Sequence, residues 1–152
     1  LSTRSPEMGL IQKADELGTS LVAFSPVGRS LLTDYPLDLE TCKSLDFLKV
    51  NPRFQDGNYQ RNISASDGFR SLASDMGVAT SGLAIAWILA KGEHVLPIPG
   101  TRSVDHLNEL ASGAELSLTT SDIETIETVL PIGWCHGDRY THAQWRGPEK
   151  YC

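Results

Sequence analysis

Two short turns combine residue types that bind phosphate groups. Each contains a glycine, a hydroxyl side chain and an arginine: SPVGR at residues 25–29 and PGTRS at 99–103. Glycine lets a ligand approach the backbone, and the planar guanidinium matches phosphate oxygens. The second turn also leads into a predicted helix, whose first N–H groups favour an anion. Either turn alone is explained by ordinary turn chemistry with a solvated arginine, whereas the pair favours phosphate binding.

Each turn follows a short apolar run that predicts a strand. Residues 21–24 read LVAF and residues 95–98 read VLPI, with no polar alternation. Such runs are typical of strands that are buried on both faces in a parallel sheet. Ligands of parallel α/β proteins bind at the carboxyl ends of the strands, where both turns would lie.

Other segments predict helices that would cover such a sheet. Capping residues, helical spacing of apolar residues and terminal glycines place them at about 6–17, 69–76, 81–91, 103–113 and from 121. Ser5-Pro6-Glu7 marks the first start, and Ser121 with Glu124 predicts a capping box. Trp87 lies in an all-apolar helix and is expected in the core. The order of predicted helices and strands along the chain indicates an α/β fold, although a sheet of two strands alone is too small to cover these helices.

Two segments lack regular periodicity. Residues 30–61 form a long connection containing NPRFQDGNYQRN, which favours a lid over a disordered segment. Residues 131–152 form an irregular, aromatic C-terminal segment. Asn62-Ile63-Ser64 matches a glycosylation sequon, which matters only in a secreted protein.

The composition is that of a soluble globular domain. Of the 152 residues, 40% are hydrophobic and 21% are charged, and 13 Lys+Arg against 19 Asp+Glu give a net charge of -6. This balance, without charged blocks, argues against nucleic-acid and membrane partners. The sequence shows neither an apolar run long enough to span a membrane nor an N-terminal signal segment, so a cytoplasmic location is expected. Cys42, Cys135 and Cys152 lack metal-like spacing and are expected to be reduced thiols.

Five motifs resemble a known family. LVAFSPVGR, NPRFQDGNYQRN, GVATSGLAIAWILAKG, VLPIPGTR and GDRY occur in the order and spacing of the C-terminal half of an aldo/keto reductase. The likeness covers nearly the whole chain, and the opening LSTR resembles the tail of the family's sixth barrel strand. The Gly-x-Arg after the last strand resembles the bacterial reductases more than the mammalian ones.

The resemblance implies a (β/α)8 barrel that binds NADPH without a Rossmann domain. Residues 21–24 and 95–98 would be strands seven and eight, so residues 1–152 would be the C-terminal part of one barrel domain. A complete barrel takes about 250 residues, and the chain begins with Leu rather than Met, so we expect the barrel to be incomplete here. The implied function of the parent protein is the metal-free, NADPH-dependent reduction of an aldehyde or ketone to an alcohol.

The resemblance also implies which residues bind NADPH. Those matching the pyrophosphate side are Ser25, Val27 and Arg29. Those matching the turn that holds the adenosine ribose and its 2′-phosphate are Gly100, Thr101 and Arg102. Arg102 is expected to select NADPH over NADH. The aligned positions on the following helix are His106, Glu109 and Leu110, of which Leu110 cannot supply the family's adenine-contacting amide.

Other residues match segments around the cofactor and substrate. The positions that match the lid are Arg53, Phe54 and Asn58. Those in the C-terminal segment, which borders the substrate pocket in this family, are Trp134, His136, Arg139 and Tyr140. For both groups, loop packing and ligand contact remain alternatives.

No catalytic residue is assigned. The family's Asp, Tyr, Lys and His come from the first half of the barrel, and no motif that carries them is present. We therefore expect the isolated chain to be inactive. Two alternatives to the reductase remain: a non-catalytic nucleotide-binding module similar to potassium-channel β subunits, or a half-barrel that pairs with a second copy or with a missing N-terminal half.

Overall fold

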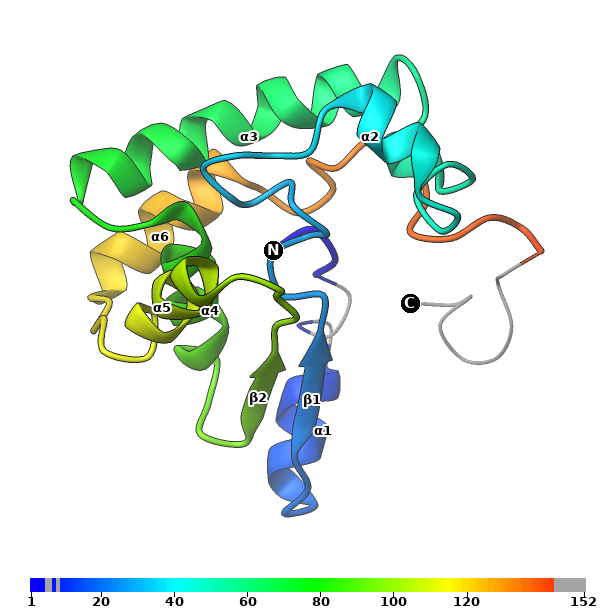
Figure 1. Cartoon of the computed structure of the whole chain (residues 1–152). Helices are drawn as coiled ribbons and strands as arrows, with labels where there is room; N and C mark the ends of the chain where they lie inside the picture. The colour runs from blue at the N-terminus through cyan, green and yellow to red at the C-terminus, as the bar shows by residue number, and fades with distance from the viewer. Residues whose placement is uncertain (5–6, 8, 144–152) are drawn as a thin grey trace.

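The computed structural model describes residues 1–4, 7 and 9–143. Its elements, in chain order, are α1 (Leu10–Glu16), β1 (Leu21–Phe24), α2 (Leu39–Ser44), the 3-10 helix η2 (Pro52–Phe54), α3 (Asn58–Asp75), α4 (Thr80–Leu89), β2 (Val95–Ile98), α5 (Val104–Ser112) and α6 (Thr120–Val129) (Figure 1). Helices combined with parallel strands confirm the predicted α/β class.

The two strands pair with each other in parallel. Leu21 lies opposite Val95, and Phe24 lies opposite Ile98. Both strands point the same way in Figure 1, so the turns that follow them leave from the same end of the sheet, at the carboxyl ends of the strands. The predicted strand bounds are confirmed, and the parallel register places the two arginine-containing turns at one end of the sheet.

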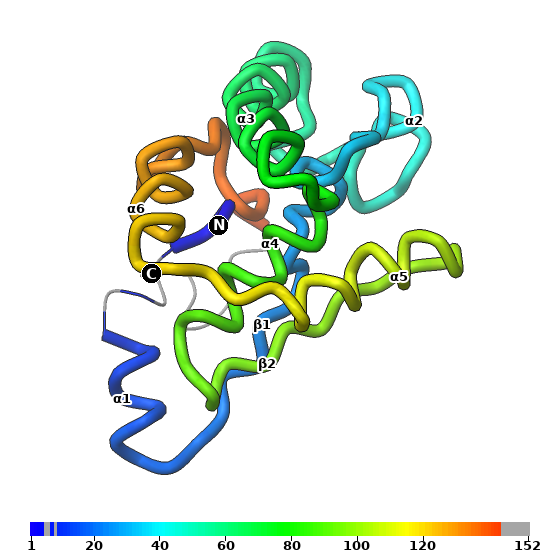
Figure 2. The backbone as a smooth tube through the Cα atoms, turned by 90° about the vertical axis from the view of Figure 1, so that its left-hand side faces the viewer, coloured from blue at the N-terminus to red at the C-terminus, as the bar shows by residue number. Residues whose placement is uncertain are grey.

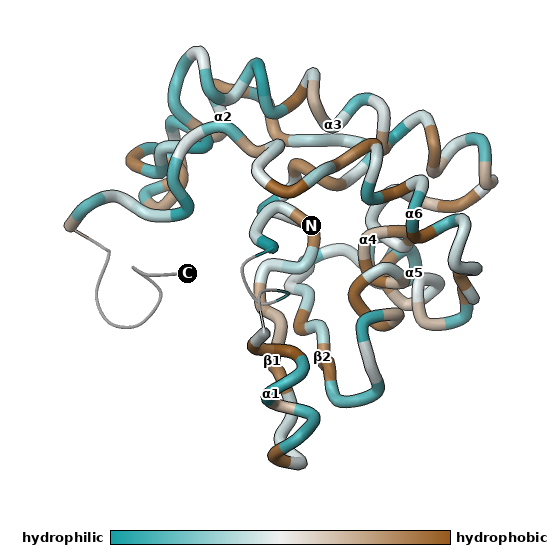
Figure 3. Tube along the Cα trace, turned by 180° about the vertical axis from the view of Figure 1, so that it is seen from behind, coloured by the Kyte–Doolittle hydropathy of each residue, from teal (hydrophilic) through white to brown (hydrophobic). Residues whose placement is uncertain are grey.

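The prediction that both strands are buried on both faces is wrong for the described chain. Leu21 and Ala23 pack against the core and Val95 is buried. The side chains that alternate with them are exposed: Val22 (52%), Phe24 (40%), Leu96 (47%) and Ile98 (54%). Helix α4 packs against β2 on the core side, and the described residues place no second layer over these four. One face of the sheet is therefore apolar and open, and Figure 3 shows hydrophobic positions on both strands.

Helix α4 is the centre of the core. Every residue from Thr80 to Ile88 is buried, as the all-apolar sequence requires, and Trp87 is 4% exposed. The long helix α3 meets α4 at a bend of 91° (Figure 2). Among the described residues, no single helix is long and apolar enough to cross a membrane, and α3 with α4 meets that criterion only as this bent pair.

Helices α4 and α5 approach each other closely at two glycines. A Cβ atom on Gly113 would lie 2.3 Å from the carbonyl oxygen of Gly82 and 2.8 Å from Cβ of Ile85. A Cβ atom on Gly82 would lie 2.9 Å from the carbonyl oxygen of Glu109. The absence of side chains at both positions sets how α5, and the turn before it, sits on the core.

Two predicted helix starts are wrong, and a third lies outside the described residues. Helix α1 begins at Leu10 after Gly9, which has a left-handed φ of 113°, and the predicted start at Ser5-Pro6 lies outside the described residues. Helix α6 begins earlier than predicted, because Thr119 forms the capping box with Asp122. Helix α3 begins at Asn58 rather than near residue 69 and takes the last four residues of the predicted lid. The Gly57 N–H donates to Oε1 of Gln60 (2.7 Å) and so fixes this start.

Candidate functional site

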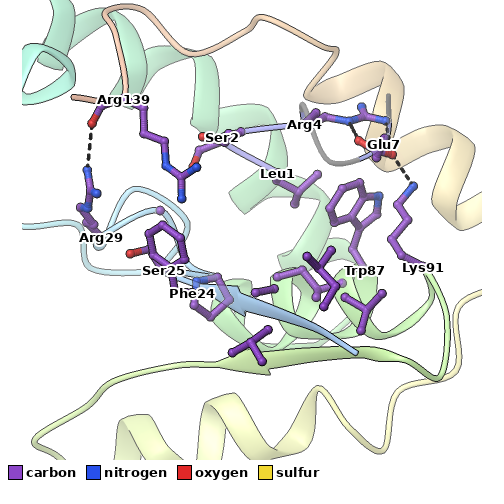
Figure 4. Close-up of a pocket in the computed structure, with 18 of the residues that line it drawn as sticks. Leu1, Ser2, Arg4, Glu7, Phe24, Ser25, Arg29, Trp87, Lys91 and Arg139 are labelled. Carbon is purple, nitrogen blue, oxygen red and sulfur yellow. Dashed lines mark hydrogen bonds and ion pairs between the residues drawn. The ribbon is translucent and has the colours of Figure 1, made fainter. Parts of the chain in front are cut away.

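A cavity of about 280 Å³ is lined by β1 and the turn that follows it (Figure 4). Every residue from Leu21 to Pro26 lines it. Because successive strand side chains point to opposite faces, this continuous lining means that the cavity follows the strand's edge. Residues 1–4 and the helix residue Trp87 line the other side. The turn that follows β1 therefore lies at one end of the cavity.

The turn after β1 has an unusual backbone. Ser25, Arg29 and Ser30 have positive φ angles of 52°, 57° and 81°. Left-handed conformations of non-glycine residues cost on the order of 1 kcal/mol each. The fully buried Leu31 and Leu32 anchor the turn, and the Leu32 N–H donates to the carbonyl of Val27 (3.1 Å). Packing thus holds Ser25 and Arg29 at the cavity, where both line the wall.

The guanidinium of Arg29 lies close to two aromatic rings and a backbone carbonyl. Its guanidinium carbon lies 4.5 Å from the ring centre of Phe47 and 5.5 Å from that of Tyr140. Nη1 donates a long hydrogen bond to the carbonyl of Arg139 (3.5 Å). Burial lowers the pKa of Arg29, and the charges of Arg139 and Arg53 act in the same direction. Such an environment favours an anionic partner.

The turn after β2 is open to solvent. No atom lies within 4 Å of the position a Cβ would take on Gly100, so a ligand can approach the backbone there. Thr101 Oγ1 accepts from the Ser103 N–H (3.2 Å), and Ser103 in turn caps α5. The Arg102 side chain is exposed, with no ion pair or side-chain hydrogen bond among the described residues. The predicted phosphate-binding cation is thus available at the start of a helix.

The predicted residues on α5 differ in accessibility. His106 is exposed, and its N–H donates to Oγ of Ser103 (3.4 Å), which places it beside the second turn. Glu109 is half-buried and accepts a hydrogen bond from Oγ of Ser81 (3.4 Å). Leu110 is 6% exposed and packs inward. The position at which the resemblance implies an adenine-contacting amide is therefore occupied by a core side chain.

Two buried asparagines tie the lid to the C-terminal segment. Asn51 Nδ2 donates to the carbonyl of Arg139 (2.8 Å). Asn62 Nδ2 donates to the carbonyls of Arg53 and His136 (2.9 Å each), and its Oδ1 accepts from the His136 N–H (2.6 Å). Both side chains are fully buried. The asparagine of the apparent sequon is therefore an internal clamp, and sequence reasoning missed both residues.

The three residues matched to the lid have different surroundings. Arg53 lines the cavity, and its Nη1 donates to Thr3 Oγ1 (3.1 Å). Its Nε donates to the carbonyl of Gly137 (3.3 Å). Burial lowers the pKa of Arg53. Phe54 is a core residue that is 2% exposed, and Asn58 donates to the carbonyl of Pro52 (3.0 Å) within the loop. Arg53 is thus the polar side chain that the lid brings to the cavity.

Of the described residues 131–143, Arg139 is the one that lines the cavity. The Arg139 guanidinium carbon lies 4.3 Å from the ring centre of Phe24 and 5.3 Å from that of Tyr140 (Figure 4). Trp134 is buried, and its Nε1 donates to the carbonyl of Leu1 (3.1 Å), which supports loop packing. The His136 side chain is exposed, and only its backbone takes part in the asparagine clamp.

A paired charge cluster lies at the other end of the cavity. Arg4 contacts Glu7 and reaches Glu127 (3.1 Å), and Lys91 Nζ lies 2.8 Å from Glu7 and 2.5 Å from Glu127. The Trp87 Nε1 also donates to Glu127 (3.2 Å). Burial alone would raise the pKa of Glu7 and Glu127, but hydrogen bonds from Arg4 and Lys91 outweigh it and lower both. This cluster is neutralised internally and connects the wall residues Arg4, Glu7 and Lys91 to Glu127 of α6.

Two predictions about cysteines and metals can be compared with the described residues. Cys42 and Cys135 are free thiols, and burial raises the pKa of both, whereas Cys152 lies outside the described residues. Within the described ranges, no group of His, Cys, Asp and Glu could hold a metal ion.

Solved structures resemble this chain in fold. A thermostable aldo-keto reductase, Tm1743, bound to the inhibitor epalrestat, matches with a TM-score of 0.56 at 24% identity, over 83% of this chain and 35% of its own. The glycerol dehydrogenase AKR11B4 from Gluconobacter oxydans matches with a TM-score of 0.65 at 24% identity, over 83% of this chain and 38% of its own. At this identity, both matches show the fold alone.

Curated sequences and a family model show the relationship. The chain is 32% identical to the probable aldo-keto reductase 1 of Glycine max, over 96% of this chain and 43% of the relative. It is 28% identical to the aldo-keto reductase yakc [NADP(+)] of Schizosaccharomyces pombe, over 92% of this chain and 41% of the relative. The chain thus spans about two fifths of the length of these relatives. The model of the aldo/keto reductase family matches residues 1–131, and the chain therefore belongs to the aldo/keto reductase family.

Proposed function

We propose that the protein containing this chain reduces an aldehyde or ketone to an alcohol with NADPH, and that this chain holds the phosphate and adenosine parts of the cofactor. The observation that carries the proposal is the parallel pairing of β1 and β2, which brings both arginine-containing turns to the same end of the sheet. The relative named for NADP(+) in Schizosaccharomyces pombe supports the choice of cofactor.

The residues at this end of the sheet fit a nicotinamide dinucleotide. The turn at Ser25–Arg29 offers a hydroxyl and a half-buried cation to a diphosphate, while Gly100 leaves open space beside the second turn. Arg102 stands exposed at the start of α5, where a guanidinium can meet the 2′-phosphate that distinguishes NADPH from NADH. The bound cofactor would supply hydride, and the residues of this chain would bind and orient it. We assign no proton donor to this chain.

Replacing Arg102 with alanine in the full-length protein should weaken NADPH binding by about 1.5–3 kcal/mol, through loss of a charge-assisted contact. NADH binding should change little, because NADH lacks the 2′-phosphate. Fluorescence titration with each nucleotide measures both affinities. Arg61→Ala, which removes another exposed arginine from α3, is the control and should affect neither nucleotide. Equal weakening of NADPH and NADH by Arg102→Ala would remove Arg102 from this role.

We further propose that strands from the rest of a (β/α)8 barrel cover the open sheet face in the complete protein. The support is the exposure of Val22, Phe24, Leu96 and Ile98 on one face, and the cavity along the edge of β1. An exposed apolar face of this kind must be covered by protein or it promotes association. The missing N-terminal half is the proposed cover, and a second copy is the alternative partner.

The isolated 152-residue chain should show no detectable carbonyl-dependent NADPH oxidation, and it should self-associate through the open face. Light scattering after size-exclusion chromatography measures association. The double variant Val22→Glu/Ile98→Glu, which places charge on that face, should reduce association, whereas Asn108→Glu on the exposed side of α5 should not. A monodisperse, active monomer would contradict both parts of the expectation.

A further inference from the structure

Two aspartates in the connection after β1 bind a threonine in the same way. Asp38 accepts hydrogen bonds from the N–H (2.7 Å) and the hydroxyl (2.8 Å) of Thr41. Asp34 accepts them from the N–H (3.1 Å) and the hydroxyl (2.5 Å) of Thr80. The first pair is 3 residues apart and lies at the start of α2, whereas the second pair is 46 residues apart. Asp34 therefore joins two separate parts of the fold.

The Asp34 carboxylate caps the N-terminus of α4. Ala79 precedes this helix, and its side chain accepts no hydrogen bond from the first turn. The first N–H groups of a helix need acceptors, and a carboxylate there also meets the positive end of the helix dipole. Thr80, the first residue of α4, is fully buried. Loss of Asp34 would therefore leave buried donors without their acceptor.

The same carboxylate fixes the segment that follows the turn at Ser25–Arg29. This segment begins with Leu31 and Leu32, which are fully buried, and Arg70 Nη1 of α3 donates to the carbonyl of Leu31 (3.0 Å). Asp34 comes directly after these residues and binds the segment to α4. The segment is thus tied to α3 by Arg70 and to α4 by Asp34.

The turn requires such support because its backbone is strained. Ser25, Arg29 and Ser30 have left-handed φ angles, which persist only where surrounding contacts outweigh their cost. Ser25 and Arg29 line the cavity (Figure 4). The second turn, at Gly100–Arg102, is connected through β2 to the other end of α4. Loss of the Asp34 contact should therefore disturb the first turn more than the second.

We propose that Asp34 is a positioning residue for the cofactor, because its hydrogen bonds to Thr80 hold the Ser25–Arg29 turn in the conformation that binds diphosphate. This inference rests on the proposed binding of NADPH by this chain. Asp34 does not line the cavity, so it acts through the turn. Charge alone predicts the opposite result, since removal of a carboxylate near an anion site should strengthen anion binding.

The test compares variants of the full-length protein by calorimetric titration with inorganic diphosphate and with adenosine 2′-phosphate. Asp34→Ala should weaken diphosphate binding by about fivefold to tenfold, as loss of a helix cap predicts, and should leave adenosine 2′-phosphate within about twofold. Asp34→Asn should stay within about twofold for both probes, because asparagine caps helices as well as aspartate does. Asp38→Ala removes the same bonding pattern within one turn of α2 and is the matched control.

Thr80→Val is a milder variant, because it removes the hydroxyl donor and keeps the N–H. It should weaken diphosphate binding by about twofold to fivefold, as expected for one hydrogen bond. Combined with Asp34→Ala, it should add nothing further, since both changes remove the same contact. Circular dichroism checks that each variant is folded.

Hydrogen exchange of the nucleotide-free protein gives a readout that needs no ligand. Asp34→Ala should raise amide exchange in residues 27–33 by about fivefold, whereas Asp38→Ala should not. Unchanged exchange there, tighter diphosphate binding by Asp34→Ala, or equal weakening of both probes would overturn the proposal. A wild type that binds neither NADPH nor diphosphate would instead refute the proposed function, and the exchange result would still decide whether Asp34 holds the turn.

Discussion

Replacing Gly113 with alanine should destabilise the protein by about 3 kcal/mol or more, although alanine is the better helix former. The reason is the close approach of α4 and α5, where the new Cβ would lie 2.3 Å from the carbonyl oxygen of Gly82. Gly113 has an ordinary φ of -62°, so backbone conformation does not account for the glycine. The helices must separate, and the contact of α5 with the core is lost over several side chains.

Chemical denaturation of the nucleotide-free protein measures this effect. Gly100→Ala is the matched control, because a Cβ there meets no atom within 4 Å, and its stability should change by less than about 0.5 kcal/mol. A stabilised Gly113→Ala variant would show that helix propensity outweighs the contact and that α5 is not held as described.

Replacing Asn62 with leucine should cost about 2–4 kcal/mol and release the C-terminal segment from the lid. Leucine has a similar volume, so the loss is chiefly that of hydrogen bonds to the carbonyls of Arg53 and His136 and from the His136 N–H. Asn62 is fully buried, so water cannot replace these contacts without local opening. The segment that carries Arg139 should then lose its fixed position.

Hydrogen exchange of residues 131–143 and chemical denaturation check this expectation together. Asn108→Leu makes the same chemical change at an exposed position of α5 and should leave exchange unaltered and stability within about 0.5 kcal/mol. If Asn62→Leu unfolds less readily than the wild type, or leaves exchange in the segment unchanged, the amide is not the clamp described.

Local signals predicted the strands better than the helix ends. Residues 21–24 and 95–98 have the predicted bounds, because apolar runs closed by Ser-Pro and Pro-Gly fix both length and ends. The start of α3 was missed because its first turns are polar and its cap depends on Gln60 reaching back to Gly57. The burial of the sheet was predicted wrongly, because an apolar run indicates what the side chains require and not which layers surround them.

The residues of the candidate site also differ in whether local sequence could reveal them. Each of the turns at Ser25–Arg29 and Gly100–Arg102 is a single short stretch of sequence, so its residue types revealed it. The parallel register accounts for their position at the same end of the sheet. Asn51 and Asn62 were not recognised, since their partners lie in the C-terminal segment and a buried asparagine has no local signature. The contact of Arg139 with Phe24 is also long-range and needed the fold to be seen.

The pairing of β1 with β2 also bears on how the protein folds. Leu21 meets Val95 only after α2, α3 and α4 have been placed between them, so the sheet requires closure of a long loop. Non-local pairings of this kind bear the largest loop-closure entropy and form slowly relative to helices. A nucleotide that bridges the two turns would therefore act chiefly on the unfolding rate, by holding together the contacts that local sequence supports least.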